Sequence, residues 1–594
     1  MHITELINMR TWRAFDVDDT SRVLAGWDDS GSVQLVEIAP DGTTITTLTD
    51  LPGSCAGRYL PGERRVVVQH DDGGNERAQL SLLDPSEPGR LTPLVHDPAY
   101  IHSLAGVLPG RVVYRTNRRN GVDFDVVLRN VSSGVEEVLY DDGGNVSSVA
   151  VSPDSRYTVI ALVGSRPVST QLLLVDALSA TPDGRLKVLT DAQEHASYEN
   201  IHWLPDSTGF VLTTNHERDM AALARYDVAG GQLSWLVTDD EHELTGWLSP
   251  NGDTLLVECN NEGWSELSLH EGYSGERISG LTLPAAGVVT APYPDPRFSP
   301  DGSVVAMSLT APDVPGDVLL LDVASRRVTA RTDTRLVGAV ATPEVHRIPA
   351  ADGEQIPCLR YAPSAQTAAS SSVTIVHGGP EGQSRPTFSP IVAALTAAGH
   401  TVLVPNVRGS AGYGKRWVSL DDVRLRLDSV HDLAAVHDWL PKLGCDPAHA
   451  ALWGGSYGGY MVLAGCAFQP ERWAAGVDIV GMSSLVTFLE NTSPYRRAAR
   501  EREYGTLEHD REFLEQASPL NRIDEVQAAL LVIHGANDPR VPLTEAEQLH
   551  AALTNRGVEC ELLVYDDEGH GLAKRVNRLD AYPRAMDFLA RHLV

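Results

Sequence analysis

Short apolar runs alternate with turns rich in Pro, Asp, Gly and Asn through the first half of the chain, and few segments there keep a helical spacing of apolar residues. Proline presets φ in such turns, and Asp or Asn with Gly tolerates a tight reversal between two strands. We therefore predict strands after the four clearest turns, at residues 157–162, 209–213, 254–258 and 304–309.

These turns recur with a regular period. The prolines that mark corresponding positions lie 44 to 52 residues apart: Pro61, Pro109, Pro153, Pro205, Pro250 and Pro300. A period of about 45–50 residues with about four strands per unit is typical of β-propeller blades, which bury their faces by stacking in a ring. Residues 12–50 supply one more unit, so we predict an all-β propeller of seven blades over residues 1–337. The regular period disfavours the alternative, a pair of β-sandwiches.

The pattern changes near Gly338. Predicted strands then alternate with predicted helices, which indicates an α/β domain with a mostly parallel sheet over residues 338–594. Residues 364–372 form a predicted surface loop, and residues 1–11 are expected to pack on this second domain. The strands are predicted at 373–376, 401–405, 450–453, 476–480, 529–533 and 561–565, and the helices at 388–398, 429–443, 458–468, 543–556 and 579–592.

Composition narrows the classes of partner. At 594 residues the chain is too long for a single core. It has 48 Lys and Arg against 79 Asp and Glu, a net charge of −31. This charge argues against nucleic-acid and anionic-membrane partners.

The cysteines and the N-terminus indicate a reducing environment. Six scattered cysteines form no CxxC pair, so neither a disulfide framework nor structural zinc is expected. No basic segment followed by an apolar core opens the chain, and no apolar run approaches the roughly 18 residues of a membrane span. We expect a cytoplasmic protein.

One glycine-rich turn carries the candidate chemistry. Gly454 and Gly458 bracket Ser456 in the pattern Gly-x-Ser-x-Gly, between a predicted strand and a predicted helix. Such a turn is a nucleophile elbow, which exposes the serine hydroxyl and places the next backbone N–H at a helix start, where negative charge is favoured. The five-residue pattern alone also occurs in ordinary tight turns, so the rest of the chain must supply a base, an acid and an oxyanion site.

Two later loops supply the missing groups. Asp538 follows the strand predicted at 529–533, and His570 lies in a Gly-flanked loop after the next strand. The chain order Ser, Asp, His is that of the α/β-hydrolase fold. We assign Ser456 as nucleophile, His570 as general base and Asp538 as the group that orients the imidazole. The competing acids at 566–568 are interpreted as a solvated charge run.

An oxyanion site needs two N–H donors. The first is expected from Tyr457, directly after the nucleophile. The second is expected from Gly379 in the segment His377-Gly378-Gly379-Pro380, which follows the first strand of the predicted parallel sheet.

Five motifs in this order over about 200 residues resemble the prolyl oligopeptidase family, closest to its acylaminoacyl-peptidase and dipeptidyl-peptidase-like bacterial members. They are His377-Gly378-Gly379-Pro380, the segment 406–414, Gly454 to Tyr460, the segment 534–542 and Glu568-Gly569-His570-Gly571. The resemblance implies a seven-bladed propeller, which the repeat indicates independently. It also implies that the propeller covers the catalytic edge of the hydrolase.

The resemblance also implies which residues bind the substrate. Arg540 matches the family's arginine that binds a substrate carbonyl near the scissile bond, and a salt bridge inside the acid loop is the alternative role. Val480, Phe488 and Val541, with Met482 and Leu485, are pocket candidates that could equally be core. The paired glutamates by which dipeptidyl peptidases hold a free amine are not recognisable in this sequence.

These observations predict a serine peptidase that hydrolyses short peptides or peptide-like amides through an acyl-enzyme, without a metal or organic cofactor. An esterase or amidase acting on a small acylated metabolite is the first alternative, because the same triad cleaves any acyl group. A propeller interaction protein with an idle hydrolase is the second. The natural substrate and the choice between aminopeptidase, acylaminoacyl and endopeptidase modes stay open. So does the oligomeric state, a homo-oligomer included.

Overall fold

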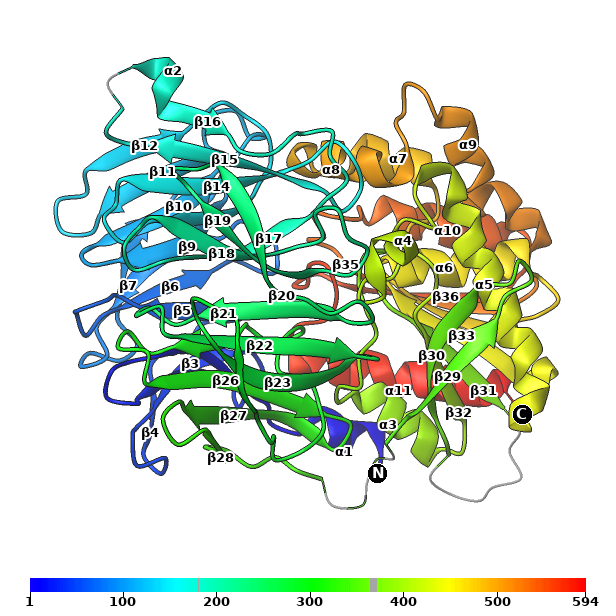
Figure 1. The fold of residues 1–594 in the computed structure, drawn as a ribbon. Helices are drawn as coiled ribbons and strands as arrows, with labels where there is room; N and C mark the ends of the chain where they lie inside the picture. The colour runs from blue at the N-terminus through cyan, green and yellow to red at the C-terminus, as the bar shows by residue number, and fades with distance from the viewer. Residues whose placement is uncertain (180, 337, 339, 341, 364–370, 594) are drawn as a thin grey trace.

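The computed structural model describes the whole chain except residues 180, 337, 339, 341, 364–370 and 594. The predicted loop at 364–372 therefore falls largely outside the described residues, as do residues around the expected domain boundary. The strand-rich first part and the mixed second part lie side by side (Figure 1). No described helix is long and apolar enough to cross a membrane.

Seven sheets of four consecutive antiparallel strands form the first part, which confirms the predicted propeller. Each blade contributes its strands in chain order. Blades one to four are β1 (Trp12–Val17), β2 (Val23–Trp27), β3 (Gln34–Ile38), β4 (Ile45–Thr47); β5 (Cys55–Tyr59), β6 (Val66–His70), β7 (Gln79–Leu83), β8 (Leu91–Val95); β9 (His102–Leu108), β10 (Arg111–Thr116), β11 (Asp125–Asn130), β12 (Glu136–Tyr140); β13 (Val146–Val151), β14 (Tyr157–Val163), β15 (Thr170–Asp176) and β16 (Leu186–Val188).

The last three blades repeat the plan. They are β17 (Tyr198–Trp203), β18 (Gly209–Thr214), β19 (Ala222–Asp227), β20 (Gln232–Val237); β21 (Glu243–Leu248), β22 (Thr254–Asn261), β23 (Trp264–Glu271), β24 (Arg277–Gly280); β25 (Arg297–Phe298), β26 (Val304–Ala311), β27 (Val314–Asp322) and β28 (Arg327–Ala330). A short helix α2 (Pro182–Arg185) precedes β16.

The proline turns join the first two strands of a blade. In the turn before β26, Ser299 N–H donates to the carbonyl of Val304 at 2.8 Å, and Asp301 accepts from the backbone N–H of Ser303 at 3.0 Å. Gly302 has a φ of +75°, which glycine adopts without a steric penalty. Proline and the short polar side chains therefore set the strand reversal that the sequence predicted.

Side-chain packing closes the ring. Trp12, Ala14 and Val17 of β1 pack with Val318 and Leu320 of β27 in one apolar cluster. Because each blade is a continuous segment, no strand is exchanged between the first and last blades. Apolar burial closes the ring together with hydrogen bonds such as that from Ala14 N–H to the hydroxyl of Ser308, at 2.9 Å.

The second part is an eight-stranded sheet with helices on both faces (Figure 1). Its order is β29-β30-β32-β31-β33-β34-β35-β36, antiparallel as far as β32 and parallel from there on. The strands are β29 (Glu344–Pro349), β30 (Gln355–Tyr361), β31 (Ser372–Val376), β32 (Thr401–Pro405), β33 (Ala450–Gly455), β34 (Ala475–Ile479), β35 (Ala529–Gly535) and β36 (Cys560–Tyr565).

The helices of this domain include several that the sequence pattern did not predict, notably α7, α8 and α9 between β34 and β35. The α-helices are α3 (Pro390–Ala397), α4 (Gly414–Val418), α5 (Arg426–Trp439), α6 (Tyr457–Phe468), α7 (Leu485–Asn491), α8 (Pro494–Tyr504), α9 (Arg511–Gln516), α10 (Thr544–Asn555) and α11 (Arg575–His592). Four 3₁₀ segments are η1 (Val423–Leu425), η2 (Leu440–Leu443), η3 (Pro447–His449) and η4 (Pro519–Glu525).

The N-terminal helix α1 (Ile3–Ile7) packs on this α/β domain. Ile3, Leu6 and Ile7 are buried with Ala393 and Ala394 of α3. The chain thus starts on the hydrolase side, forms the whole propeller and returns (Figure 1).

Candidate active site

Ser456 stands at the sharp turn between β33 and α6. Its φ of +59° and ψ of −119° are sparsely populated for a residue with a side chain, and this strain is typical of a functional turn. A Cβ on Gly454 would overlap the carbonyl of Gly458, and one on Gly458 would overlap that of Val376. Both glycines of the predicted elbow are therefore sterically required.

The structure brings the three expected residues into one hydrogen-bonded chain. The Ser456 hydroxyl lies 2.8 Å from Nε2 of His570, and Nδ1 of His570 lies 2.7 Å from Oδ2 of Asp538. In this arrangement Ser456 donates to the imidazole and the imidazole donates to the carboxylate. Asp538 and His570 follow β35 and β36, so adjacent parallel strands deliver both loops to the same sheet edge.

Backbone donors fix the carboxylate of Asp538. Its Oδ1 accepts from the N–H of Arg540 at 2.8 Å and of Val541 at 3.1 Å, which leaves Oδ2 for His570. The side chain of Asp538 is fully buried, so few competing water contacts are available. This geometry is suited to holding the imidazole in one tautomer.

The competing acids match the expected solvated run only in part, because Asp566 and Asp567 are exposed and Glu568 is buried. Glu568 is only 2% exposed, and it accepts from the backbone N–H groups of Ala573 and Lys574. It therefore anchors the loop that carries His570. Burial of Glu568 could not be inferred from a run of three adjacent acids.

A pocket of about 290 Å³ opens beside Ser456. Gly379 lies on its wall, and a Cβ on the preceding Gly378 would sit 3.4 Å from the Cβ of Ser456. Tyr457 begins α6, whose first backbone N–H groups lack intrahelical partners. Gly379 thus lies in the same pocket as Ser456 and Tyr457 follows Ser456 directly, and the role of their N–H groups as the two donors stays a prediction. His377 orients its loop by contacts to Ser410 Oγ and to the carbonyl of Gly378, both at 2.8 Å.

The pocket candidates divide into two groups. Phe488, Val541 and Met482 line the pocket. Val480 instead lies in the apolar cluster beneath α11, and Leu485 lies in the opposite core, so the alternative of a core position holds for these two. The residue pattern could not separate wall from core, because both are apolar.

Arg540 also lines the pocket, but its ion-pair partner is not in the acid loop. Its Nε lies 2.6 Å from Oε1 of Glu76, which stands between β6 and β7 of the propeller. The same propeller loop contacts both catalytic loops: Asn537 Nδ2 lies 3.3 Å from the carbonyl of Gly73, and a Cβ on Gly74 would meet Gly569 N at 2.7 Å. The alternative of a bridge inside the acid loop was therefore wrong.

A buried charged cluster behind Tyr457 was missed by sequence reasoning. The fully buried guanidinium of Arg426 pairs with both Asp421 and Glu503. Tyr457 shares a hydrogen bond of 2.7 Å with Ser429 and donates to Asp421 at 3.2 Å. Burial raises the pKa of Asp421 to about 7 and that of Glu503 to about 8. No local motif marks these residues, and the cluster holds the ring of Tyr457 at the start of α6.

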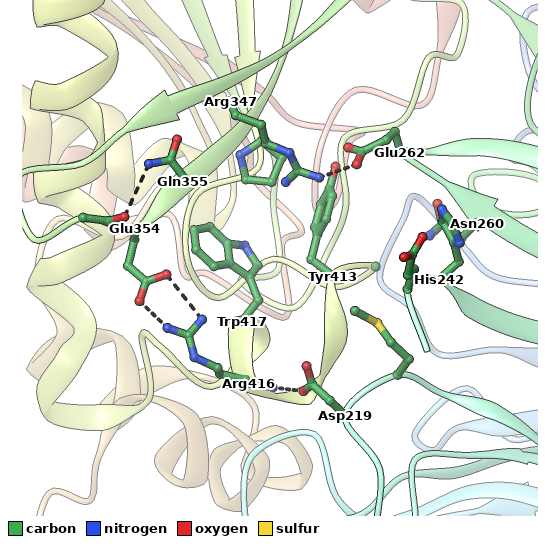
Figure 2. Close-up of a pocket in the computed structure, with 15 residues that line it drawn as sticks. Asp219, His242, Asn260, Glu262, Arg347, Glu354, Gln355, Tyr413, Arg416 and Trp417 are labelled. Carbon is green, nitrogen blue, oxygen red and sulfur yellow. Dashed lines mark hydrogen bonds and ion pairs between the residues drawn. The ribbon is translucent and has the colours of Figure 1, made fainter. Parts of the chain in front are cut away.

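A second pocket, of about 280 Å³, lies between the propeller and the hydrolase (Figure 2). Two ion pairs line it. Arg347 of the hydrolase pairs with Glu262 of the propeller, and Arg416 pairs with Glu354 within the hydrolase. Tyr413 lies under the guanidinium of Arg347. None of the expected site residues lines this pocket, so we interpret it as part of the domain interface.

Comparison with known proteins agrees with this geometry. Residues 386–594 match the model of the prolyl oligopeptidase family. The C-terminal domain is a prolyl oligopeptidase family domain. The chain is 26% identical over 614 residues to dipeptidyl aminopeptidase BIII of Pseudoxanthomonas mexicana, covering 94% of this chain and 86% of that protein.

Other relatives match one domain or the fold. The human acylamino-acid-releasing enzyme is 28% identical over 229 residues, 37% of this chain and 31% of that protein. The structure of a puromycin-hydrolyzing peptidase of Mycobacterium tuberculosis has a TM-score of 0.86 at 19% identity, covering 100% of this chain and 96% of that one. The family match covers residues 386–594, and the similarity to this solved structure extends over both domains of the fold.

Proposed function

We propose that this peptidase hydrolyses short peptides or peptide-like amides through an acyl-enzyme formed on Ser456. The observation that supports this most directly is the hydrogen-bonded chain from Ser456 through His570 to Asp538 beside a pocket that the propeller loop at Glu76 reaches. His570 takes the proton of Ser456 as the hydroxyl attacks the substrate carbonyl, and then protonates the leaving amine. Water attacks the acyl-enzyme with the same base.

Charge that develops on the attacked oxygen is stabilised by the backbone N–H groups of Tyr457 and Gly379. Donors of this kind act in a site from which water is largely excluded, and removing one typically costs about 10²–10³-fold in kcat. The start of α6 favours negative charge at the same place. Because both donors are backbone groups, their contribution depends on the two loops keeping their shape.

The propeller supports selection by size. Its loop between β6 and β7 contacts the loops that follow β35 and β36, so it lies over the catalytic edge. A folded protein would have to unfold before a segment reached Ser456, at a cost of roughly 5–15 kcal/mol. Short flexible peptides have no such cost.

The test compares three substrate classes: aminoacyl anilides, acylated aminoacyl anilides and simple p-nitrophenyl esters. We expect turnover of at least one class of anilide. Cleavage of the esters with no detectable cleavage of either anilide would favour an esterase. Failure of a fluorophosphonate probe to label the folded protein would favour an idle hydrolase. The two anilide classes also separate an aminopeptidase, which needs a free amine, from an acylaminoacyl peptidase.

A further inference from the structure

Three arginines stand on the wall of the pocket that contains Ser456. Arg496 and Arg500 come from α8, and Arg540 comes from the loop after β35. The other charged residue of the wall is Glu381. This arginine wall, Arg496, Arg500 and Arg540, is unexpected in a chain whose net charge is −31.

Arg500 keeps most of its hydrogen-bonding capacity free. Its one side-chain hydrogen bond among the described residues is from Nη1 to the carbonyl of Gly379, at 3.4 Å. Its Nε is buried without a hydrogen-bond partner among the described residues. The carboxylates of Glu381 and Glu503 act on Arg500 electrostatically, but neither forms a hydrogen bond with its side chain. A guanidinium has five N–H donors arranged to bind a carboxylate through two parallel bonds.

The nearby acids do not neutralise the wall. Burial disfavours a charge on Glu381, but the positive charges of Arg500 and Arg426 and hydrogen bonds to the carboxylate together outweigh burial, so the pKa of Glu381 is lowered and its carboxylate offsets one arginine. Glu76 offsets a second arginine, because its carboxylate lies 2.6 Å from Arg540. Its distance to Arg496 is longer, at 3.8 Å. Burial, with the charges of Arg540 and Arg500, lowers the pKa of Arg496. Among these five groups the three arginines therefore outnumber the two carboxylates.

The position of Arg500 limits which carboxylate could reach it. Arg500 bonds to the carbonyl of Gly379, and Gly379 is one of the two proposed oxyanion donors. The guanidinium therefore lies within about one residue of the attacked carbonyl. Resting on the proposed function, we propose that the arginine wall selects an acidic side chain, Asp or Glu, on the residue whose carbonyl is attacked.

The test measures kcat and KM for capped anilides that differ only in the residue before the cut: Glu, the isosteric Gln, and Leu. The nitroanilide leaving group has no carboxylate, so any preference for Glu over Gln comes from the side chain. A charged hydrogen bond suggests about a 10-fold or greater preference for Glu in kcat/KM. Free-amine versions of the same three substrates cover the aminopeptidase mode.

Variants on α8 assign the preference to Arg500. Arg500→Gln is expected to lower kcat/KM for the Glu substrate about 10-fold or more, mainly through KM, and to change the Gln substrate by less than about 3-fold. Arg500→Lys should retain part of the preference, since the charge remains. Arg497→Gln is the matched control, because Arg497 lies on the same helix, donates to the carbonyl of Glu490 and is not part of the pocket wall.

Three results would overturn the proposal. Equal kcat/KM for Glu and Gln in the wild type would remove the selectivity. Equal losses on both substrates in Arg500→Gln would show that Arg500 only supports the Gly379 loop. The third result is a peptide that is cleaved faster with a free terminal carboxylate than as its amide, combined with no preference for Glu before the cut. The arginine wall would then bind the carboxylate of the leaving residue. Labelling by a fluorophosphonate with no cleavage of any anilide would refute the proposed function itself.

Discussion

Asp478 provides a quantitative test of the packing beneath the nucleophile turn. It lies on β34, is 1% exposed, and a Cβ on either Gly459 or Gly481 would overlap its Oδ1. Burial raises the pKa of Asp478 to about 7, opposed only by a backbone hydrogen bond from Gly481. The carboxyl is thus protonated in the folded protein under conditions where it ionises in the unfolded chain.

The sign of the pH effect follows from this difference. With a pKa of about 7 folded and about 3.9 unfolded, the native state binds more protons between these values, so stability falls as the pH rises through that window. The penalty is on the order of 1–2 kcal/mol at pH 5 and about 4 kcal/mol at pH 9. Replacing Asp478 by Asn removes the ionisation at little change in shape.

We therefore expect the stability of Asp478→Asn relative to the wild type to increase by roughly 2–3 kcal/mol between pH 5 and pH 9. Urea unfolding of both proteins at pH 5, 7 and 9, followed by tryptophan fluorescence, measures this difference. Comparing the two proteins at each pH cancels the titration of every other group. A difference that stays constant across the three pH values would refute a buried, protonated Asp478.

Three further predictions concern activity. Ser456→Ala should lower turnover by on the order of 10⁴-fold or more and abolish fluorophosphonate labelling while circular dichroism stays unchanged; a mutant that keeps most of its activity would end the serine mechanism. Arg540→Lys should lose more kcat/KM on peptides than on small esters, since lysine lacks the planar fork; equal losses would point to the ion pair with Glu76 as its only role. A short peptide should be cleaved efficiently and a folded protein of matching sequence negligibly in mass-spectrometric time courses; comparable rates would contradict selection by the propeller.

Local sequence was sufficient for much of this architecture. The turns at Pro153, Pro205, Pro250 and Pro300 reverse the chain between strands, because proline presets φ and the polar side chains bond to the backbone within the turn. The period of these turns therefore predicted the blades. Of the two glycines around Ser456, Gly454 is dictated by a contact within the strand–turn–helix unit, and Gly458 by a contact with the neighbouring strand β31. The order of Ser456, Asp538 and His570 then indicated how adjacent parallel strands would bring them together.

Tertiary structure alone decided the features that depend on long-range contacts. Val480 and Val541 are equally apolar, and only packing placed one in the core and the other on the pocket wall. Arg540 meets Glu76 across 464 positions of sequence, and Glu568 is buried because a later loop folds over it. The ion pair of Arg540 depends on how the propeller docks on the hydrolase, whereas the burial of Val480 and Glu568 depends on packing inside the hydrolase. No local pattern of residues determines either.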